Sequence, residues 1–426
     1  MTSEVVVLNK KGIIVAADSA VTTGVFNASH PRYSKAANKI FDISPQGNVA
    51  ITIFGAAEID QVPWELALKL FRSSLQGSEP LPRLHDYVSA VIAFLKGNAS
   101  IFPEPKVLTA GRFPHALLHV IRSAGRLQPP FLDTDASEPD RIAAWNLAEV
   151  QLKQRFEQSA VHPSLNADDL GAALNDLGSY VAIANAELEN SPLKDIISQR
   201  EEVTKLALSA LFKEPTQFLS HTGVVAAGYG GGEIFPSYQC AHVYGHVGSS
   251  LLYEMPDYLS RAITHSTASW IQAFAQSSMI DVFTDGFGFS LQSIIREKSQ
   301  EKLDLLIEKL RGEGVPIPSE VADPIVKNIH DEFMGEWQQK NYAVNFAPLR
   351  TVLAGLSIQE MSHLAETLLT LESLKERVTS PTESVGGPID IAAITKSEGL
   401  VWIKRKHYFE PELNLRYTRR VQSSSS

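Results

Sequence analysis

The chain opens with Thr2-Ser-Glu-Val-Val-Val-Leu-Asn-Lys-Lys-Gly-Ile-Ile-Val-Ala-Ala-Asp18 behind its initiator methionine. Residues 5–8 and 13–17 are two apolar runs separated by turn-forming residues, so the pattern predicts a β-hairpin that begins at the chain terminus. Both runs are continuous rather than alternating, which is typical of strands covered on both faces. We therefore expect Thr2 at the end of a sheet strand and Asp18 directly after the second strand.

Thr2 has chemistry of its own. Its side chain is small, so methionine aminopeptidase is expected to remove Met1 and leave Thr2 with a free amine. A terminal threonine then holds a hydroxyl nucleophile and a base on one residue. The α-amine has an ordinary pKa of about 7.7–8.0, so near neutral pH part of it can accept the hydroxyl proton without a histidine. Met-Thr starts are common, and an ordinary first residue is the alternative on this evidence alone.

Two further strands and a pair near the other end extend the pattern. Residues 39–43 and 49–54 predict strands, and the second leads into Gly55. Residues 386–400, Gly-Gly-Pro-Ile-Asp-Ile-Ala-Ala-Ile-Thr-Lys-Ser-Glu-Gly-Leu, predict a last strand pair. Together with the Thr2 start and the Ala-Ala-Asp18-Ser motif, these pieces resemble a proteasome β-type subunit, in the threonine branch of the N-terminal nucleophile (Ntn) hydrolases.

The resemblance implies an α+β fold, a four-layer αββα Ntn-hydrolase sandwich of two antiparallel sheets with helices on both outer sides. The 426 residues exceed what one such fold usually needs, and helical periodicity predicts inserted helical segments. The first insertion is predicted at 97–217, with helical stretches near 141–159, 167–189 and 193–212, and the second at 287–350. The predicted core consists of an N-terminal half at 1–96, a return sheet and central helix at 218–286 with the helix near 268–286, and a last helix with final strands at 351–410, before a tail at 411–426.

The same resemblance implies roles for four residues. Thr2 Oγ would attack a peptide carbonyl and form an acyl-enzyme ester that water then hydrolyses. Lys39 would lie beneath the hydroxyl and stabilise the developing alkoxide, and Asp18 would pair with Lys39 and keep it charged. Gly55 would supply a backbone N–H to the oxyanion hole, where one donor is typically worth about 3–4 kcal/mol. The simpler interpretations are a turn cap for Asp18, a solvated lysine for Lys39 and a strand end for Gly55.

A substrate pocket is also implied. Four small or apolar residues fall where the family shapes its first specificity pocket, which predicts an apolar residue before the cleaved bond: Val21, Ala37, Ile53 and Ala57. Sheet core is the alternative interpretation of these positions.

Some positions depart from the family pattern. Shortly before Gly386, active members carry an aspartate and a serine that orient the terminal amine, whereas this chain has Thr382 and Val385. A further family serine, at the start of a central helix, has no clear match, with Ser277 and Gln276 as weak candidates. The residues expected to orient the Thr2 amine, the base, are therefore less complete than those expected around its hydroxyl, the nucleophile.

Composition excludes several classes of protein. Lys and Arg number 38 against 48 Asp and Glu, and the net charge of -10 argues against a nucleic-acid surface. The single cysteine allows no intrachain disulfide, and no apolar run approaches 18 residues, so no membrane contact is expected and the cytoplasm is the default location. The glycine-rich run 228–232 lacks the Gly-Lys-Ser/Thr of a phosphate loop, and no histidine spacing suggests zinc, so neither a cofactor nor a metal is expected.

Three functions remain in competition. The first is a proteasome-like threonine-type peptidase or amidohydrolase, whose partners would be a peptide or amide substrate. The second is a catalytically inactive assembly or scaffold subunit, which Thr382 and Val385 favour. The third is a small-molecule amidase whose helical insertions restrict access to the site. Because only Met1 precedes Thr2, we expect no self-cleavage of a propeptide. That arrangement resembles the bacterial two-component threonine protease, so a homo-oligomer and an ATPase partner are candidates.

Overall fold

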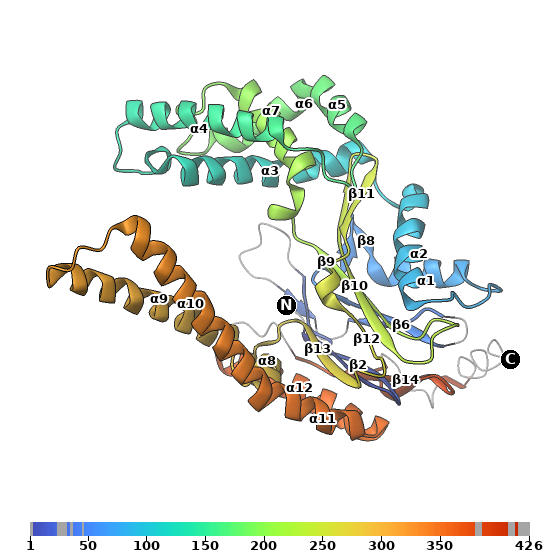
Figure 1. Ribbon diagram of the computed structural model, residues 1–426. Helices are drawn as coiled ribbons and strands as arrows, with labels where there is room; N and C mark the ends of the chain where they lie inside the picture. Colours follow the sequence, from blue (N-terminus) through green and yellow to red (C-terminus); the bar gives the residue numbers. More distant parts are fainter. Residues whose placement is uncertain are drawn as a thin grey trace.

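The computed structural model describes residues 3–23, 32–34, 37–44, 47–379, 386–407 and 414–415, without the side chains of 21–23 and 32–34. Within this part of the chain, the strands form two main antiparallel sheets and the helices gather in separate groups around them (Figure 1). The predicted α+β class with antiparallel sheets is therefore confirmed.

The first sheet joins the two ends of the chain. Among the described residues it has five strands in the order β13 (Ser269–Ala275), β1 (Ser3–Asn9), β2 (Gly12–Ala17), β14 (Asp390–Thr395) and β15 (Gly399–Lys404). β1 is paired along both edges, because Val7 lies opposite Ile14 of β2 and Ile271 of β13. This pairing satisfies the backbone donors and acceptors of a strand that is buried over its whole length.

The second sheet has six strands within the described residues. Five follow the order β11 (Ser250–Glu254), β10 (Ser237–Val247), β9 (Thr222–Gly228), β6 (Val49–Phe54) and β5 (Ile40–Asp42), and β12 (Ser260–Ala262) pairs with β10. Two short hairpins accompany the sheets, β3 (Val21–Thr23) with β4 (Arg32–Ser34) and β7 (Glu58–Ile59) with β8 (Val62–Pro63).

The helices form three groups along the chain. After the first half of the sheets come α1 (Trp64–Ser74) and α2 (Leu84–Gly97). The second group is α3 (Pro105–Leu127), α4 (Glu138–Gln158), α5 (Ala167–Asn175), α6 (Leu177–Glu189) and α7 (Arg200–Lys213). The third is α8 (Ser278–Asp285), α9 (Phe289–Gly312), α10 (Ser319–Asn341), the π-helix Tyr342–Phe346, α11 (Ala347–Gly355) and α12 (Ile358–Thr379). The 3-10 turns are Ala99–Ile101, Pro129–Phe131, Pro215–Gln217 and Asp257–Leu259.

An apolar layer fills the space between the two sheets. Val6, Leu8 and Val15 contribute to it from the first sheet, and Val225 and Cys240 from the second. We call this set of contacts the inter-sheet layer. Because successive side chains of a strand point to opposite faces, every second residue of β1 enters the layer, and the residues between them face the other way.

Helices pack against the outward faces of both sheets. Met361 and Leu368 of α12 join the same apolar cluster as Val5 of β1. Trp64 of α1 and Val88 of α2 join a separate cluster with β6 and β9 of the second sheet. The sheets are therefore buried on both faces, as their continuous apolar runs predict.

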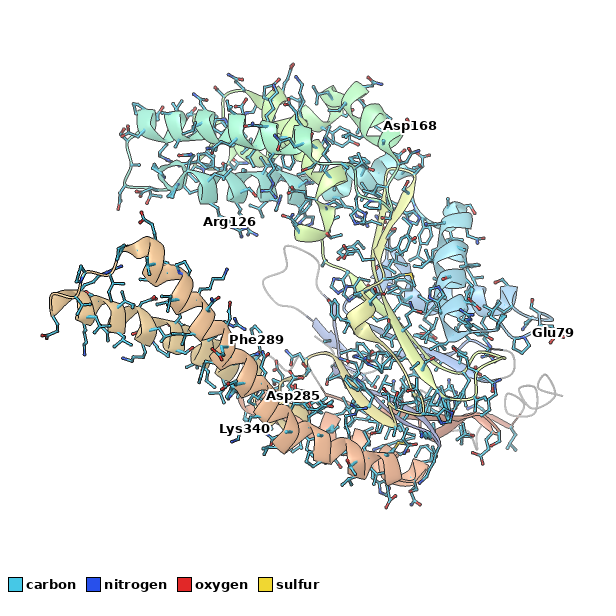
Figure 2. The ribbon with its side chains drawn as sticks, in the orientation of Figure 1. Glu79, Arg126, Asp168, Asp285, Phe289 and Lys340 are labelled. Atoms are coloured by element: carbon cyan, nitrogen blue, oxygen red, sulfur yellow. The ribbon has the colours of Figure 1, made fainter. Side chains whose placement is uncertain are left out.

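The helices α3–α7 share one apolar core, which also includes Val247 of β10 and Leu252 of β11, whereas α9 and α10 form a hairpin that extends away from the sheets (Figure 1). In Figure 2, Arg126 marks α3 and Phe289 marks the start of α9, on two separate helical groups. The domain boundaries stay a prediction. No helix within the described residues has the length and apolar character needed to cross a membrane.

The helix expected near 268–286 is partly wrong. Residues Ser269–Ala275 form the edge strand β13, and a helix begins only at Ser278. The reason is tertiary: β1 would otherwise expose a row of backbone N–H and C=O groups along its outer edge, and β13 pairs with them from Ser3 to Asn9.

The helix α3 is the reverse case, since no helix is predicted before residue 141 within the first insertion. Pro105 suits the first turn of a helix, but Gly111 and Pro114 lie inside it and argue locally against one. Burial of apolar side chains such as Phe113 and Val120 in the core of the α3–α7 group outweighs this local penalty.

Candidate functional site

Asp18 and Lys39 form a buried ion pair at the end of the inter-sheet layer. Lys39 Nζ lies 2.6 Å from Asp18 Oδ1, and the two side chains are only 4% and 1% exposed. Asp18 directly follows β2 of the first sheet, and Lys39 directly precedes β5 of the second. The structure thus brings together two predicted site residues through a contact between the sheets.

The carboxylate of Asp18 also ties together the two ends of the chain. The backbone N–H of Ser3 donates to Asp18 Oδ1 at 3.1 Å, and the backbone N–H of Gly386 donates to Oδ2 at 2.8 Å. With Lys39, the Asp18 side chain accepts hydrogen bonds from three donors. The residue directly after Thr2 and the glycine directly after the segment 382–385 therefore meet at one carboxylate.

Burial lowers the pKa of Lys39, and the opposing charge and hydrogen bond of Asp18 raise it. An ammonium removed from water loses hydration free energy, and a nearby carboxylate restores part of it. The pair therefore holds a cation at a buried site from which solvent is largely excluded. Such a cation is suited to stabilising a developing negative charge.

Gly55 lies in a conformation that favours glycine. Its φ is +93°, and a Cβ atom at this position would lie 2.7 Å from the carbonyl oxygen of His221. The backbone of residue 55 therefore approaches β9 more closely than any side chain allows. This geometry is compatible with the predicted oxyanion role, which itself stays a prediction.

A small pocket lies beside Gly55. Its volume is about 150 Å³. Its lining includes three of the four predicted pocket residues together with two predicted catalytic residues: Ala37, Ile53, Ala57, Lys39 and Gly55. Ile53 also belongs to the apolar core behind the second sheet, whereas Ala57 is exposed. The side chain of Val21 lies outside the described residues.

Other predicted residues are placed only in part. Thr2, Thr382 and Val385 lie outside the described residues. Ser277 directly precedes α8, and its hydroxyl donates to Asp281 at 2.9 Å. Within the described residues, no group of three His, Cys, Asp or Glu side chains is arranged to hold a metal ion.

Sequence analysis missed Glu4, a fully buried carboxyl group on β1. Its charge state is coupled to Lys39 and Asp18, which both influence its pKa. The available signal was the alternation of β1, because Glu4 has the same parity as Val6 and Leu8 and a strand buried on both faces places all three in the inter-sheet layer.

A pair of histidines near Gly55 was also missed. The rings of His221 and His242 stack with centroids 3.9 Å apart, and the ring of Phe54 meets both edge-on. Burial, with a smaller contribution from His221, lowers the pKa of His242 to about 4. Burial also lowers the pKa of His221, so both rings are neutral at neutral pH and add no charge beside the pocket.

Comparisons with known proteins give only distant likenesses. No family model matches the chain. No curated protein matches it. Among solved structures it is similar to Anbu from Hyphomicrobium sp. strain MC1, with 9% identity and a TM-score of 0.29 over 99% of this chain and 96% of that one. It is also similar to the structure described as the helical assembly of the Anbu complex from Pseudomonas aeruginosa, with 8% identity and a TM-score of 0.30 over 99% and 95%.

A third similar structure is Anbu, described as an ancestral beta-subunit, from Yersinia bercovieri, with 10% identity and a TM-score of 0.26 over 99% of this chain and 94% of that one. At these TM-scores the likeness carries no argument about fold or function. The assignment to the proteasome β-type subunits is wrong: no family model matches the chain, and the similar structures reported above are described as Anbu. Strand ends and glycine turns are short motifs, and they were not specific enough to identify that family.

Proposed function

We propose that this chain is a hydrolase of the N-terminal nucleophile type, in which Thr2 becomes the terminal residue and cleaves amide bonds. The observation that carries the proposal is the ion pair between Lys39 and Asp18, whose carboxylate also accepts the N–H of Ser3. A buried cation whose carboxylate partner also binds the backbone N–H of Ser3, the residue after Thr2, supports a role in lowering the free energy of a threonine alkoxide.

The proposed chemistry follows from groups on this chain. The Thr2 amine accepts the proton of the Thr2 hydroxyl as Oγ bonds to the substrate carbonyl carbon, and the amine then protonates the leaving amine. Water hydrolyses the resulting ester and regenerates the hydroxyl. Gly55 supplies an oxyanion donor, and the pocket beside it accepts a small apolar side chain. The proposed architecture is the four-layer αββα sandwich, supported by the packing of helices on both outer faces of the paired sheets.

Labelling with a peptide epoxyketone tests the proposal directly, because this warhead reacts with both the hydroxyl and the amine of a terminal threonine. The intact mass of the purified chain is measured before and after treatment. We expect loss of Met1 and one adduct, which Thr2→Ala abolishes and Thr351→Ala, an exposed change on α11, retains. If the chain keeps Met1 and gains no adduct, the proposal is overturned, and the result favours the alternative of a catalytically inactive scaffold subunit.

Substrate size separates the peptidase from the small-molecule amidase. If the wild-type chain is labelled, cleavage of a peptide library and of short acyl amides distinguishes the two. Self-association, an ATPase partner and a cytoplasmic location remain parts of the proposal, and light scattering of the purified chain tests the first of them.

A further inference from the structure

Glu4 points into the interior between the two sheets. It lies opposite Ala17 of β2 and Phe274 of β13, and Val6 and Leu8 on the same face of β1 belong to the inter-sheet layer. The side chain of Glu4 is completely buried. It enters the layer at the end where Asp18 and Lys39 meet.

The carboxyl group of Glu4 has no hydrogen-bond partner among the described residues, at either oxygen. The hydroxyl of Thr52, on the inner face of β6, is likewise buried without a partner within the part of the chain that the structure describes. The two side chains are near enough for the Thr52 hydroxyl to influence the pKa of Glu4. Glu4 and Thr52 are thus two neighbouring polar side chains in the otherwise apolar inter-sheet layer.

Asp18 and Glu4 have opposite environments although both are buried. Asp18 accepts hydrogen bonds from Lys39, Ser3 and Gly386, so both of its oxygens have donors. Burial raises the pKa of Glu4 well above its usual range, with a smaller rise from Asp18, while Lys39 and Thr52 lower it. A buried carboxylate without donors is so unfavourable that such a group takes up a proton instead.

The other elements around Glu4 add no further charge. Cys240 faces it from β10, and burial raises the pKa of that thiol far enough to keep it neutral. Phe274 lies opposite it on β13 and is apolar. Among the described residues, the charges that act on Glu4 are therefore those of Lys39, before β5, and Asp18, after β2.

We propose that Glu4 is held as a neutral carboxylic acid, a positioning residue that adds no second negative charge beside the Lys39–Asp18 pair. The inference rests on the proposed hydrolysis at Thr2. If Glu4 were ionised, a second carboxylate beside Lys39 would weaken the positive potential of the ammonium and raise the free energy of the proposed Thr2 alkoxide. A neutral Glu4 leaves the full effect of the cation available to the nucleophile.

The first test measures the protonation of Glu4 without using activity. Glu4→Gln is nearly isosteric and permanently neutral. Native Glu4 holds a proton that the unfolded chain releases above about pH 4.3, so Glu4 lowers stability as the pH rises from there towards its native pKa. We expect Glu4→Gln to raise the thermal midpoint near neutral pH and to leave it unchanged at about pH 4. A lower midpoint at neutral pH would mean that Lys39 has lost a partner, and it would overturn the proposal.

Glu372 offers a matched control. It is also a buried glutamate, but Ser278 Oγ and the backbone N–H of Met279 donate to its two oxygens at 2.8 and 2.7 Å. Glu372→Gln removes a charge that is hydrogen-bonded, so it should lower the thermal midpoint near neutral pH. Opposite signs for the two substitutions are the expected result, and equal signs contradict the proposal.

The second test uses the rate of epoxyketone addition to Thr2. We expect Glu4→Gln, whose side chain is permanently neutral, to react as fast as the wild type near neutral pH, because wild-type Glu4 keeps its proton there. A Glu4→Gln variant that reacts severalfold faster than the wild type near neutral pH would mean that wild-type Glu4 is ionised, and it would overturn the proposal. If the wild type gains no adduct, the proposed function fails instead, and the thermal measurements still decide the charge of Glu4.

Discussion

Glu4 and Leu8 lie on the same strand, on the same face, and are both completely buried, yet they belong to two different interiors. Leu8 contacts apolar side chains from both sheets in the inter-sheet layer. Glu4 lies at the end of the layer near Lys39 and Asp18. The comparison teaches that burial alone does not distinguish core from site. The difference lies in what surrounds the buried atoms.

The two interiors are stabilised by different forces. The apolar end is held by burial and close packing, which tolerate a change of pH. The polar end is stabilised by an ion pair and by backbone donors. The contribution of these interactions to the free energy of unfolding changes when one of the charged groups gains or loses a proton. The polar end lies where β2 ends and β5 begins, so its groups come from strand ends rather than from strand centres.

The largest effect is expected from breaking the ion pair. Lys39→Met leaves the buried carboxylate of Asp18 without its cation, and we expect a loss of about 3–5 kcal/mol in the free energy of unfolding, measured by urea denaturation. Adding Asp18→Asn should restore part of this loss, because the remaining group is then neutral. A loss below about 1 kcal/mol would show that the pair contributes no more than an exposed one.

A change at the apolar end is expected to be smaller and independent of pH. Leu8→Ala removes a fully buried side chain, which typically lowers the free energy of unfolding by about 2–5 kcal/mol, and we expect about 3 kcal/mol at both neutral and mildly acidic pH. The half-exposed Leu66 on α1 is the control, since Leu66→Ala should change it by less than about 0.5 kcal/mol. A pH-dependent loss at Leu8 would mean that the two ends of the layer are not separate.

The smallest effect on stability is expected from a substitution of His242. This residue lies on β10, on the same face of the second sheet as the inter-sheet layer but beyond the end of that layer. The native ring has a pKa of about 4, against 6.5 for an ordinary histidine, so the unfolded chain binds its proton first. Stability from His242 is therefore present above about pH 6.5 and is lost as the pH falls towards 4.

His242→Phe should reduce this acid loss by about 1–2 kcal/mol after allowance for the partly exposed ring, as measured by urea denaturation at neutral pH and near pH 4.5. The exposed His363 on α12 is the control, and His363→Phe should leave the acid loss unchanged. An identical acid loss in His242→Phe and the wild type would contradict the stacked, neutral pair with His221.

Local sequence was informative where strands are continuous apolar runs. Residues 5–8, 13–17 and 49–54 lie within β1, β2 and β6, because a short apolar run between turn residues has few alternatives to a buried strand. The same reasoning failed at β13, where pairing with β1 outweighs a helical pattern, and at α3, where core packing outweighs Gly111 and Pro114. Short motifs also suggested a family that the comparisons do not support.

For the candidate site, the sequence by itself determined which groups were available: a hydroxyl and an amine at residue 2, a carboxylate after a strand, a lysine before one, and a glycine at a strand end. Only the tertiary structure decided that Asp18 and Lys39 meet, since they adjoin strands of different sheets. It also decided that neither carboxyl oxygen of Glu4 accepts a hydrogen bond from the described residues. The physical reason is that charge, hydration and pKa depend on neighbours distant in the chain, whereas strand formation depends largely on neighbours within it.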